Sequence, residues 1–236
     1  MLSQIRTLRQ RLYRGWFSAS AAGADVLCLV CGWHGKRWLQ NTCPRCNSMP
    51  RHRLMPFAVG HFRVNLANGG LLHVGANIEE VAWIERKFSP RPYHRLDLID
   101  RPTTNLRGNL CELSLPCESV QHALLWHVLE HIPDDRSAIA QLFRVLKPGG
   151  SVIASVPIEP KGREKTYEDA SIPREQFEAV HGHYDHVRSC GLDYAERFIA
   201  AGFEVETLTI GEETAERKFY GLSVGHVVWC CRKPQR

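Results

Sequence analysis

The sequence predicts an α/β fold built on a doubly wound, mostly parallel sheet. The clearest evidence is Val120–Pro157, where an apolar run, a polar turn, an amphipathic segment, a Gly-Gly pair and a second apolar run follow one another. Short apolar runs without alternation are typical of strands that are buried on both faces. Two such strands joined by a helix form a crossover unit, and residues 71–99 repeat the pattern. Doubly wound sheets are built from such units.

The helix of the central unit has recognisable ends. Asp134 is expected to cap its first turn, and Asp135 adds negative charge where the helix dipole favours it. Apolar residues then recur at helical spacing up to Leu146. We expect Pro148-Gly149-Gly150 to stop the helix and 151–156 to form the next strand.

Similar patterns predict the other elements and the domain organisation. Strands are expected at 71–74, 93–99, 203–210 and 223–231, and helices at 78–88, at 193–201 and from a basic turn at 51–55 through about 67, with a charged loop or short helix at 212–220. The predicted domains are a basic N-terminal helix (1–24), a cysteine-rich segment (25–54) and an α/β domain (55–236) with a polar insertion at 158–191.

Composition narrows the class of protein. Hydrophobic residues make up 44% of the 236-residue chain and charged residues 23%, as in ordinary soluble domains. No apolar run approaches the roughly 20 residues that span a bilayer, and no secretory signal is evident. Nine cysteines, four of them in close pairs, fit a reducing compartment. We expect a cytoplasmic protein without a membrane span, whose net charge of +5 permits an anionic partner. Its oligomeric state stays open.

The first 18 residues combine basic and apolar side chains. Four arginines occur without an acid, at positions 6, 9, 11 and 14, while Ile5, Leu8 and Leu12 follow helical spacing. Such a helix can lie on nucleic acid or on an anionic membrane surface. One short stripe is weak evidence for that, so we favour a terminal helix that packs its apolar residues on its own protein.

Two cysteine pairs predict a metal centre. They are Cys28/Cys31 and Cys43/Cys46, with eleven residues between the pairs. Two thiolates with two residues between them can bind one ion, and two such knuckles complete a tetrahedral set. Four thiolates leave no open coordination position, so the predicted zinc is structural. His34 or His52 can replace a cysteine, although nothing requires it; the alternative is four reduced surface thiols, which proteins usually avoid.

The first crossover unit predicts a ligand site. Gly75 follows a strand and precedes a helix, so a ligand can approach its backbone. Asp97 stands 22 positions later at the end of the next strand, where a carboxylate can accept hydrogen bonds from two ribose hydroxyls.

The insertion supplies candidate catalytic groups. They are Tyr167, Glu168, Asp169, His181, His183, Asp185, His186 and Arg188. Because the insertion follows the fifth strand of an open α/β sheet, we expect it to overhang the ligand crevice. Asp185 can orient His186 as a general base near neutral pH. The same histidines and aspartate can instead bind a second metal, or form a polar loop without chemistry.

Two further patterns do not predict a defined site. His127 and His131 flank Glu130 as in zinc proteases, but Pro133 prevents a continuous helix from carrying both histidines, so we reject that interpretation. The basic run 51–53 fits either an anion contact or a solvated turn.

An ordered set of motifs resembles the class I S-adenosylmethionine-dependent methyltransferases, and most closely their "methyltransferase type 11" branch. The motifs are 71–77, Asp97, Asn109-Leu110, 127–131 and 146–150, and the resemblance extends over about 70–233. The cysteine knuckles with the run 43–53, together with 167–169 and 185–188, resemble a subgroup with a zinc-binding head.

The resemblance implies a Rossmann-like sheet of seven strands whose last strand is antiparallel, with S-adenosylmethionine across the carboxyl ends of the first strands. Gly75 and Ala76 would lie near the methionine part of the cofactor and Asp97 would hold the ribose. Asn109 and Leu110 would flank the adenine, and His127 would close the pocket.

Four positions depart from the family pattern. The family usually has an acidic residue at His73, a second glycine at Asn77, and aspartates at Asn109 and His122. Asn109 retains a carbonyl oxygen that can accept from an adenine amino group. We therefore favour a working but divergent pocket over an inactive one.

Three functions are compatible with these residues. The first is methyl transfer to a hydroxyl or similar acceptor of a small molecule or saccharide, with His186, Asp185 and His127 as catalytic residues. The second is methylation of RNA held by the knuckles and the basic helix; against it, the basic residues lack interleaved exposed aromatics. The third is a non-catalytic binding protein with a degenerate pocket.

Overall fold

The computed structural model describes residues 2–212 and 215–235, which form two compact units. The smaller unit combines the chain up to Gly60 with Ile210–Val224, and the larger unit combines His61–Thr209 with the chain from Gly225 onward. The predicted domain of 55–236 did not anticipate that 210–224 packs with the N-terminal segment. No helix within the described ranges is long and apolar enough to cross a bilayer.

The smaller unit is built from short elements. They are α1 (Leu2–Ser20), β1 (Val26–Leu27), β2 (His34–Gly35), most of α2 (Pro50–His61), and α7 (Ala215–Tyr220). β1 and β2 form an antiparallel pair that leads into the first cysteine knuckle. The helix α2 begins at Pro50, earlier than predicted, because a proline at the first helical position has the φ angle that a helix needs.

The predicted apolar stripe of α1 does not pack as expected. Leu12 is 65% exposed, whereas Phe17 and Ala21 are buried. The side chains of Arg6, Arg9, Ile5 and Leu8 lie outside the described residues. The helix therefore contacts its own unit through its C-terminal end and leaves the described part of the stripe exposed.

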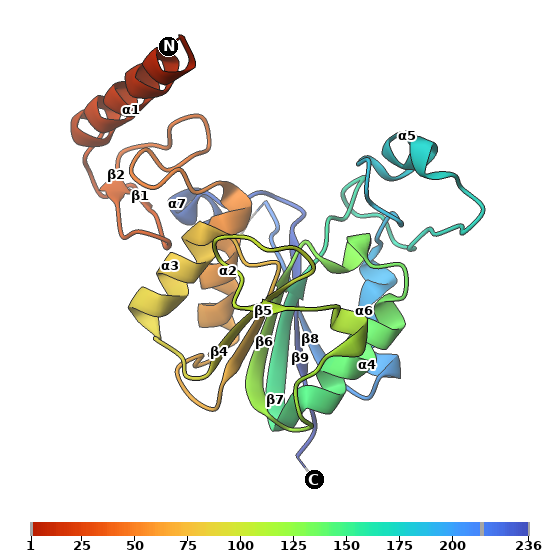
Figure 1. The fold of residues 1–236 in the computed structure, drawn as a ribbon. Coiled ribbons are helices and arrows are strands. Elements are labelled where there is room, and N and C mark those ends of the chain that lie inside the picture. The colour runs from red at the N-terminus through yellow and green to blue at the C-terminus, as the bar shows by residue number, and fades with distance from the viewer. Residues whose placement is uncertain (1, 213–214, 236) are drawn as a thin grey trace. The chain divides into compact units, whose positions relative to one another are not determined.

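A seven-stranded sheet forms the centre of the larger unit (Figure 1). Its strands are β3 (Leu71–Val74), β4 (Tyr93–Asp97), β5 (Leu106–Arg107), β6 (Val120–Trp126), β7 (Leu146–Ser155), β8 (Glu204–Thr209) and β9 (Val227–Arg232). The spatial order is β5-β4-β3-β6-β7-β9-β8. β9 is antiparallel to both of its neighbours, and the other pairings are parallel. The predicted α/β class, the sheet of seven strands and the antiparallel last strand are confirmed.

Helices cover both faces of this sheet. α3 (Ile78–Lys87) lies on one face, and α4 (Asp135–Val145) and α6 (Ala195–Ala200) lie on the other (Figure 1). The insertion, which carries the short helix α5 (Phe177–His181), lies beyond the ends of α4 and α6 (Figure 1). Its ends are joined by isolated β-bridges between Ile158 and Cys190 and between Tyr167 and Ser189.

The central crossover is present as predicted, with one correction. The Asp134 side chain accepts from the Ser137 N–H at 3.0 Å and caps α4, as expected. However, the helix ends at Val145, and β7 begins at once by pairing Leu146 with Val120. The Pro-Gly-Gly sequence lies inside β7, where the register shifts before His122 pairs with Ser151. Gly149 has a φ of +71°, which glycine adopts readily, and it lies where the register of β7 shifts. It therefore allows an irregularity within the strand and does not end the helix.

Candidate active site and cysteine cluster

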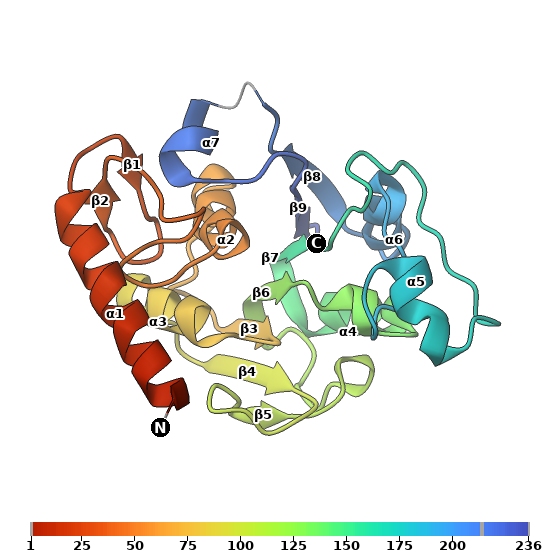
Figure 2. The ribbon, with the colours of Figure 1, turned by 90° about the horizontal axis from the view of Figure 1, so that it is seen from above.

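The predicted cofactor residues follow four neighbouring strands at one edge of the sheet. Gly75 comes directly after β3, Asp97 ends β4, and His127 follows β6. Asn109 and Leu110 follow β5. Because β5, β4, β3 and β6 are adjacent and parallel, their carboxyl ends meet at the same edge (Figure 2). The fold thus brings together side chains that are up to 52 positions apart in sequence.

The turn after β3 requires glycine. Gly75 has a φ of +65°, and its N–H donates to the Leu96 carbonyl at 2.9 Å. A Cβ at this position would lie 3.0 Å from Val128 Cγ2, so a side chain would crowd the turn. Both observations fit a backbone that a ligand can approach closely.

Asn77, at the position where the methyltransferases that the sequence resembles usually have a second glycine, caps α3. Its side chain accepts from the Glu80 N–H at 2.9 Å, and the Glu80 carboxylate accepts from the Asn77 N–H at 3.2 Å. This reciprocal pair is a capping box. The departure at Asn77 therefore has a structural explanation, because the asparagine stabilises the helix that follows the glycine turn.

His73 is fully buried in β3 between two partners. Its Nδ1 lies 3.0 Å from the Tyr93 hydroxyl, and its Nε2 lies 3.3 Å from Glu80 Oε2. Burial raises the pKa of Tyr93, so the phenol keeps its proton and can donate it to Nδ1. The other ring nitrogen then carries the hydrogen that faces Glu80.

The Asp97 carboxylate already has polar partners. Oδ1 accepts from the Ile99 N–H at 3.1 Å, and Oδ2 lies 2.9 Å from Arg101 Nε. The Arg101 side chain is largely exposed, and exposed ion pairs are worth only about 0–1 kcal/mol, so a ribose can displace it at little cost. Leu98 and Ile99 are exposed beside Asp97 and offer an apolar surface; β4 stops at Asp97 instead of reaching Ile99 as predicted.

Asn109 and Leu110 have local roles as well. The Asn109 side-chain oxygen accepts from the Cys111 N–H at 3.0 Å and caps a short 3-10 helix, Leu110–Glu112. The Leu110 side chain is buried in the main core. A carbonyl oxygen has two lone pairs, so Asn109 can still accept from a second donor.

His127 adopts an unusual backbone conformation. Its φ is +54°, and its N–H donates to the Ser155 carbonyl at 2.9 Å. A positive φ in a residue other than glycine is uncommon and concentrates at functional sites. Its ring Nδ1 lies 3.5 Å from Oε1 of Glu130, which is fully buried.

The insertion brings its histidines to this turn. His183 is hydrogen-bonded to Asp185, and Asp185 Oδ1 lies 3.1 Å from Nδ1 of His131. The His186 ring packs edge-on against His131, with 4.7 Å between the ring centroids. Asp185 thus contacts His183 and His131, where sequence reasoning paired it with His186. Sequence reasoning gave Glu130 and His131 no role, although both lie in the motif 127–131 and in the pattern that we rejected as a zinc-protease site.

Two groups in this cluster have shifted pKa values. Burial lowers the pKa of His186, which therefore stays neutral at physiological pH. Burial opposes ionisation of Asp185, but the hydrogen bond from His183 and the electrostatic influence of the surrounding imidazoles outweigh it and lower the pKa of Asp185. The cluster therefore offers a neutral imidazole beside an ionised carboxylate.

Other candidates from the insertion are structural. Arg188 is buried; its guanidinium donates to the carbonyls of Leu129 and Ile132, both at 2.7 Å, and forms an ion pair with Glu168 at 2.8 Å. His181 Nδ1 lies 2.9 Å from Ser189 Oγ. Asp169 accepts from the Ser171 backbone and hydroxyl. The Tyr167 side chain remains 45% exposed, while its backbone forms the bridge with Ser189.

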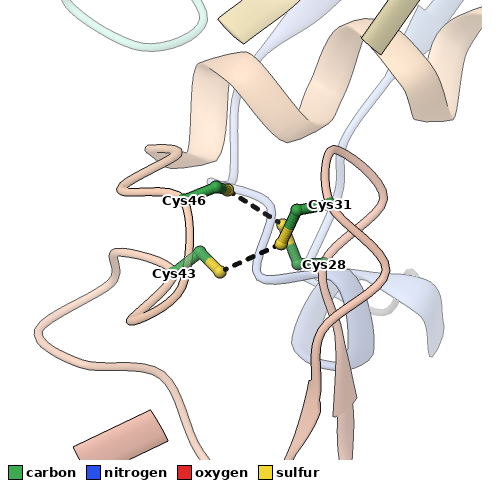
Figure 3. A group of neighbouring side chains, drawn as sticks. All are labelled: Cys28, Cys31, Cys43 and Cys46. Atoms are coloured by element: carbon green, nitrogen blue, oxygen red, sulfur yellow. Dashed lines mark hydrogen bonds between the residues drawn. The ribbon is translucent and has the colours of Figure 1, made fainter. Parts of the chain in front are cut away.

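The four cysteines form a cluster in the smaller unit (Figure 3). Cys28 Sγ lies 3.7 Å from Cys46 Sγ, and Cys31 Sγ lies 3.6 Å from Cys43 Sγ. Tetrahedral zinc with Zn–S bonds of about 2.3 Å places sulfur atoms about 3.8 Å apart. All four thiols lie within 4.8 Å of one another, whereas neither His34 nor His52 belongs to the group. The arrangement fits a closed four-thiolate metal site.

Arg53 is buried below this cluster instead of facing solvent or an anion. Its guanidinium donates to the carbonyls of Tyr220 (2.8 Å), Asn41 (2.8 Å), Gly221 (2.7 Å) and Ser48. It also lies 4.0 Å from the centre of the Trp38 ring. Arg53 thereby connects the cysteine loops to the segment 210–224, which corrects the expectation of an anion contact or a solvated turn at this residue.

Comparison with known proteins agrees with this architecture. Residues 59–154 match the family model described as "Methyltransferase domain" (Methyltransf_11). An S-adenosylmethionine-dependent methyltransferase of Archaeoglobus fulgidus covers 77% of this chain and 94% of its own at 11% identity, with a TM-score of 0.55. The larger unit has the class I methyltransferase fold.

Two further relatives define the limits of this assignment. A Mycolicibacterium smegmatis protein named "Probable S-adenosylmethionine-dependent methyltransferase" is 42% identical over 57 residues, which are 24% of this chain and 22% of that protein. The [4+2]-cyclase SpnF shares the fold, with a TM-score of 0.59 at 12% identity over 96% of this chain and 97% of its own. A protein named for cyclisation thus has this architecture, so the reaction has to be argued from the site.

Proposed function

We propose that the chain transfers a methyl group from S-adenosylmethionine to an oxygen of a small-molecule or saccharide acceptor. One observation carries the proposal: Asn109, Asp97, Gly75 and His127 follow four adjacent parallel strands at their shared carboxyl edge. Ligands of open α/β sheets bind at that edge. The family match over 59–154 includes all four residues.

The residues at this edge fit the parts of the cofactor. The tight turn at Gly75 and Ala76 admits the methionine part to the backbone. Asp97 receives the ribose hydroxyls once Arg101 moves aside, and the exposed Leu98 and Ile99 give the adenine an apolar surface. Asn109 and the Leu110 backbone border the adenine.

The cluster of His127, Asp185 and His186 acts on the acceptor. Bound S-adenosylmethionine supplies a methyl group that its sulfonium has already activated. The protein then has to align the acceptor and remove a proton from it. His186 is the candidate base because it is neutral. Asp185 contacts His131 and His183 and thereby orients these two rings, which lie next to His186. His127 lines the site at the carboxyl end of β6.

Calorimetric titration with S-adenosylmethionine tests the cofactor site. We expect saturable binding that Asp97→Ala weakens at least tenfold, which corresponds to about 1.4 kcal/mol. Arg101→Ala is the matched control, since it removes the partner of Asp97 and leaves the carboxylate free; its affinity should be unchanged or higher. A folded wild-type sample that does not bind the cofactor would contradict the proposal and support a non-catalytic binding protein.

We also assign structural zinc to Cys28, Cys31, Cys43 and Cys46. The sulfur separations match tetrahedral coordination, and four thiolates leave no position for a substrate. Hydrogen bonds that the other three thiols donate to Cys28 lower its pKa, so this cluster favours a thiolate even before a metal binds.

Methylation of RNA is a second candidate, favoured by the surface of α1. Tyr13 and Trp16 are 54% and 65% exposed and alternate with Arg11 and Arg14, which corrects the expectation that exposed aromatics are lacking. An open hollow of about 600 Å³ in the smaller unit is lined by Arg11, Arg14, Gly15, Ser18, Ala19, Ala22, Trp33, His34, Pro44 and Arg45. Stacking rings next to arginines suit single-stranded nucleic acid.

Salt dependence distinguishes this candidate. Binding of a single-stranded RNA should weaken steeply with salt, and Trp16→Ala with Arg45→Ala should reduce it. Binding that is weak at low salt and insensitive to both substitutions would leave the small-molecule acceptor as the proposed substrate.

A further inference from the structure

We propose that Glu130, His131 and His186 form a binding site for one divalent transition-metal ion, separate from the cysteine cluster. One ligand atom from each residue lies within 4.8 Å of the others. Two histidines and one carboxylate are a frequent ligand set for zinc and for other first-row metals. The set joins the turn after β6 to the insertion, since Glu130 and His186 are 56 positions apart in sequence.

The first argument is the state of the Glu130 carboxylate. Its side chain is fully buried, and neither oxygen has a hydrogen-bond partner among the described residues. A buried carboxylate without compensation is strongly unfavourable. Nδ1 of His127 lies 3.5 Å and Nε2 of His131 lies 3.8 Å from Oε1. A cation held between this carboxylate and the imidazoles compensates its charge.

The second argument is the orientation of His131. Its Nδ1 faces Asp185 Oδ1 at 3.1 Å, so its Nε2 is left on the side of Glu130. His131 Nδ1 also lies 3.3 Å from the main-chain carbonyl oxygen of Asp185, and metal-binding histidines usually donate their other ring N–H to a carboxylate or a backbone carbonyl. Tetrahedral ligands at about 2.0–2.1 Å from zinc are about 3.4 Å apart, so the 3.8 Å between His131 Nε2 and Glu130 Oε1 needs only a small contraction.

The third argument is that the backbone already holds the insertion against this turn. The Val187 N–H, next to His186, donates to the Glu130 carbonyl at 3.0 Å. Arg188 adds its bonds to the carbonyls of Leu129 and Ile132. These contacts fix His186 close to His131 without a contribution from the metal, so the ligand set is largely preformed.

Three protein ligands leave an open coordination position. Resting on the proposed function, an acceptor hydroxyl would bind there, and the ion would make its proton easier to remove. With the ion bound, the lone pair of His186 binds the metal, so His186 is then a ligand instead of the base, and the acceptor proton passes to solvent. The ligand class is thus an oxygen-bearing acceptor, while the site itself is defined by metal binding alone.

Metal stoichiometry of the full chain tests the site. The protein is loaded with Zn²⁺, dialysed against free Zn²⁺ at a fixed micromolar concentration, and analysed for metal per chain. We expect two ions for the wild type and one for His186→Ala and for Glu130→Gln, with at least tenfold weaker binding of the second ion. His186→Ala is the more informative variant, since His186 is partly exposed, whereas Glu130 is fully buried and its replacement is more disruptive to the fold.

His183→Ala is the matched control on the same loop. His183, Asp185 and His186 form an alternative group of three, but His183 is not among the proposed ligands. It should retain two ions. Loss of the second ion in His183→Ala with retention in Glu130→Gln would overturn the assignment, as would one ion in both the wild type and His186→Ala.

Two features of the experiment distinguish loss of this metal site from misfolding and from a missing cofactor site. Co²⁺ bound by the cysteine cluster gives a thiolate charge-transfer band, which should be equal in all of these variants. The titration of metal is done without S-adenosylmethionine, so a missing cofactor site leaves it unaffected. A variant that lacks the thiolate band is misfolded. If Glu130→Gln lacks it, the metal content of His186→Ala alone tests the proposed site.

Discussion

The Glu80 carboxylate lies 3.3 Å from the Nε2 atom of the buried His73. Glu80 belongs to α3 and His73 to β3, so the contact crosses the glycine turn at Gly75. The family usually has an acidic side chain at the position of His73. Here the strand carries a histidine, and the helix supplies a carboxylate beside it. The two departures at His73 and Asn77 are therefore connected, because Glu80 is the partner of both.

Replacement of Asn77 tests the helix cap. Asn77→Ala removes the acceptor for the Glu80 N–H, and loss of such a cap costs about 0.5–2 kcal/mol. Asn77→Gly, which restores the usual family residue, should cost only a few tenths of a kcal/mol by the same measure. Urea denaturation followed by far-ultraviolet circular dichroism compares the two. Equal losses would show that the capping box contributes little.

Replacement of Arg53 tests the core of the smaller unit. Arg53→Ala leaves buried carbonyls without a donor, and each such group costs about 1–3 kcal/mol, so we expect the smaller unit to lose much of its stability. Arg51→Ala, at an exposed neighbouring position, should change stability by about 0.5 kcal/mol or less. Tryptophan fluorescence, to which Trp38 beside Arg53 contributes, follows the transition. Similar midpoints for both variants would contradict the structural role.

Removal of metal from the cysteine cluster should unfold the smaller unit. Metal binding to deprotonated thiols is linked to folding, so a strong chelator or a fall in pH should release zinc and lower the unfolding temperature. Cys43→Ser should reproduce the effect, because the Cys43 thiol is buried in the cluster. Cys117→Ser is the control, since Cys117 is exposed and outside the cluster. Zinc content by mass spectrometry and thermal denaturation measure the outcome.

Local patterns were enough for most of the fold. The runs that became β3 and β6 are buried on both faces, and the Asp134 cap acts within four residues. Such signals depend on neighbouring residues in the chain. The end of α4 was mispredicted because Leu146 pairs with Val120, 26 positions away, and this ladder competes with the helix for the backbone.

The site was predictable only in part for a related reason. Residues that follow adjacent parallel strands lie at the same edge of the sheet. The positions of Gly75, Asp97 and His127 could therefore be predicted from the sequence once the strand order was assumed. The contact of the insertion with Glu130 depends on one backbone hydrogen bond from Val187 and on the buried Arg188, which no periodicity reveals. The burial of Arg53 likewise depends on residues 210–224, far away in sequence.

His122 provides a pH-dependent contribution to stability. It lies in β6, where the family usually has an aspartate, and its Nδ1 is 2.9 Å from Ser151 Oγ. Burial lowers its pKa to about 4, from the usual value of about 6.5. The folded state therefore keeps this histidine neutral at pH values where the unfolded chain binds a proton. Stability from this group is complete above about pH 6.5 and declines as the pH falls towards 4.

Replacement of His122 by asparagine should reduce this dependence. Each unit of pKa shift corresponds to about 1.4 kcal/mol, so the wild type should lose up to about 3 kcal/mol from this group between pH 6.5 and 4. In His122→Asn that part of the loss should disappear, because an amide does not titrate and can still bond to Ser151. Urea denaturation at pH 7, 5.5 and 4.5 measures the difference between the two proteins. If the free energy of unfolding of both fell in parallel, His122 would be protonated in the folded state, and burial would not control its charge.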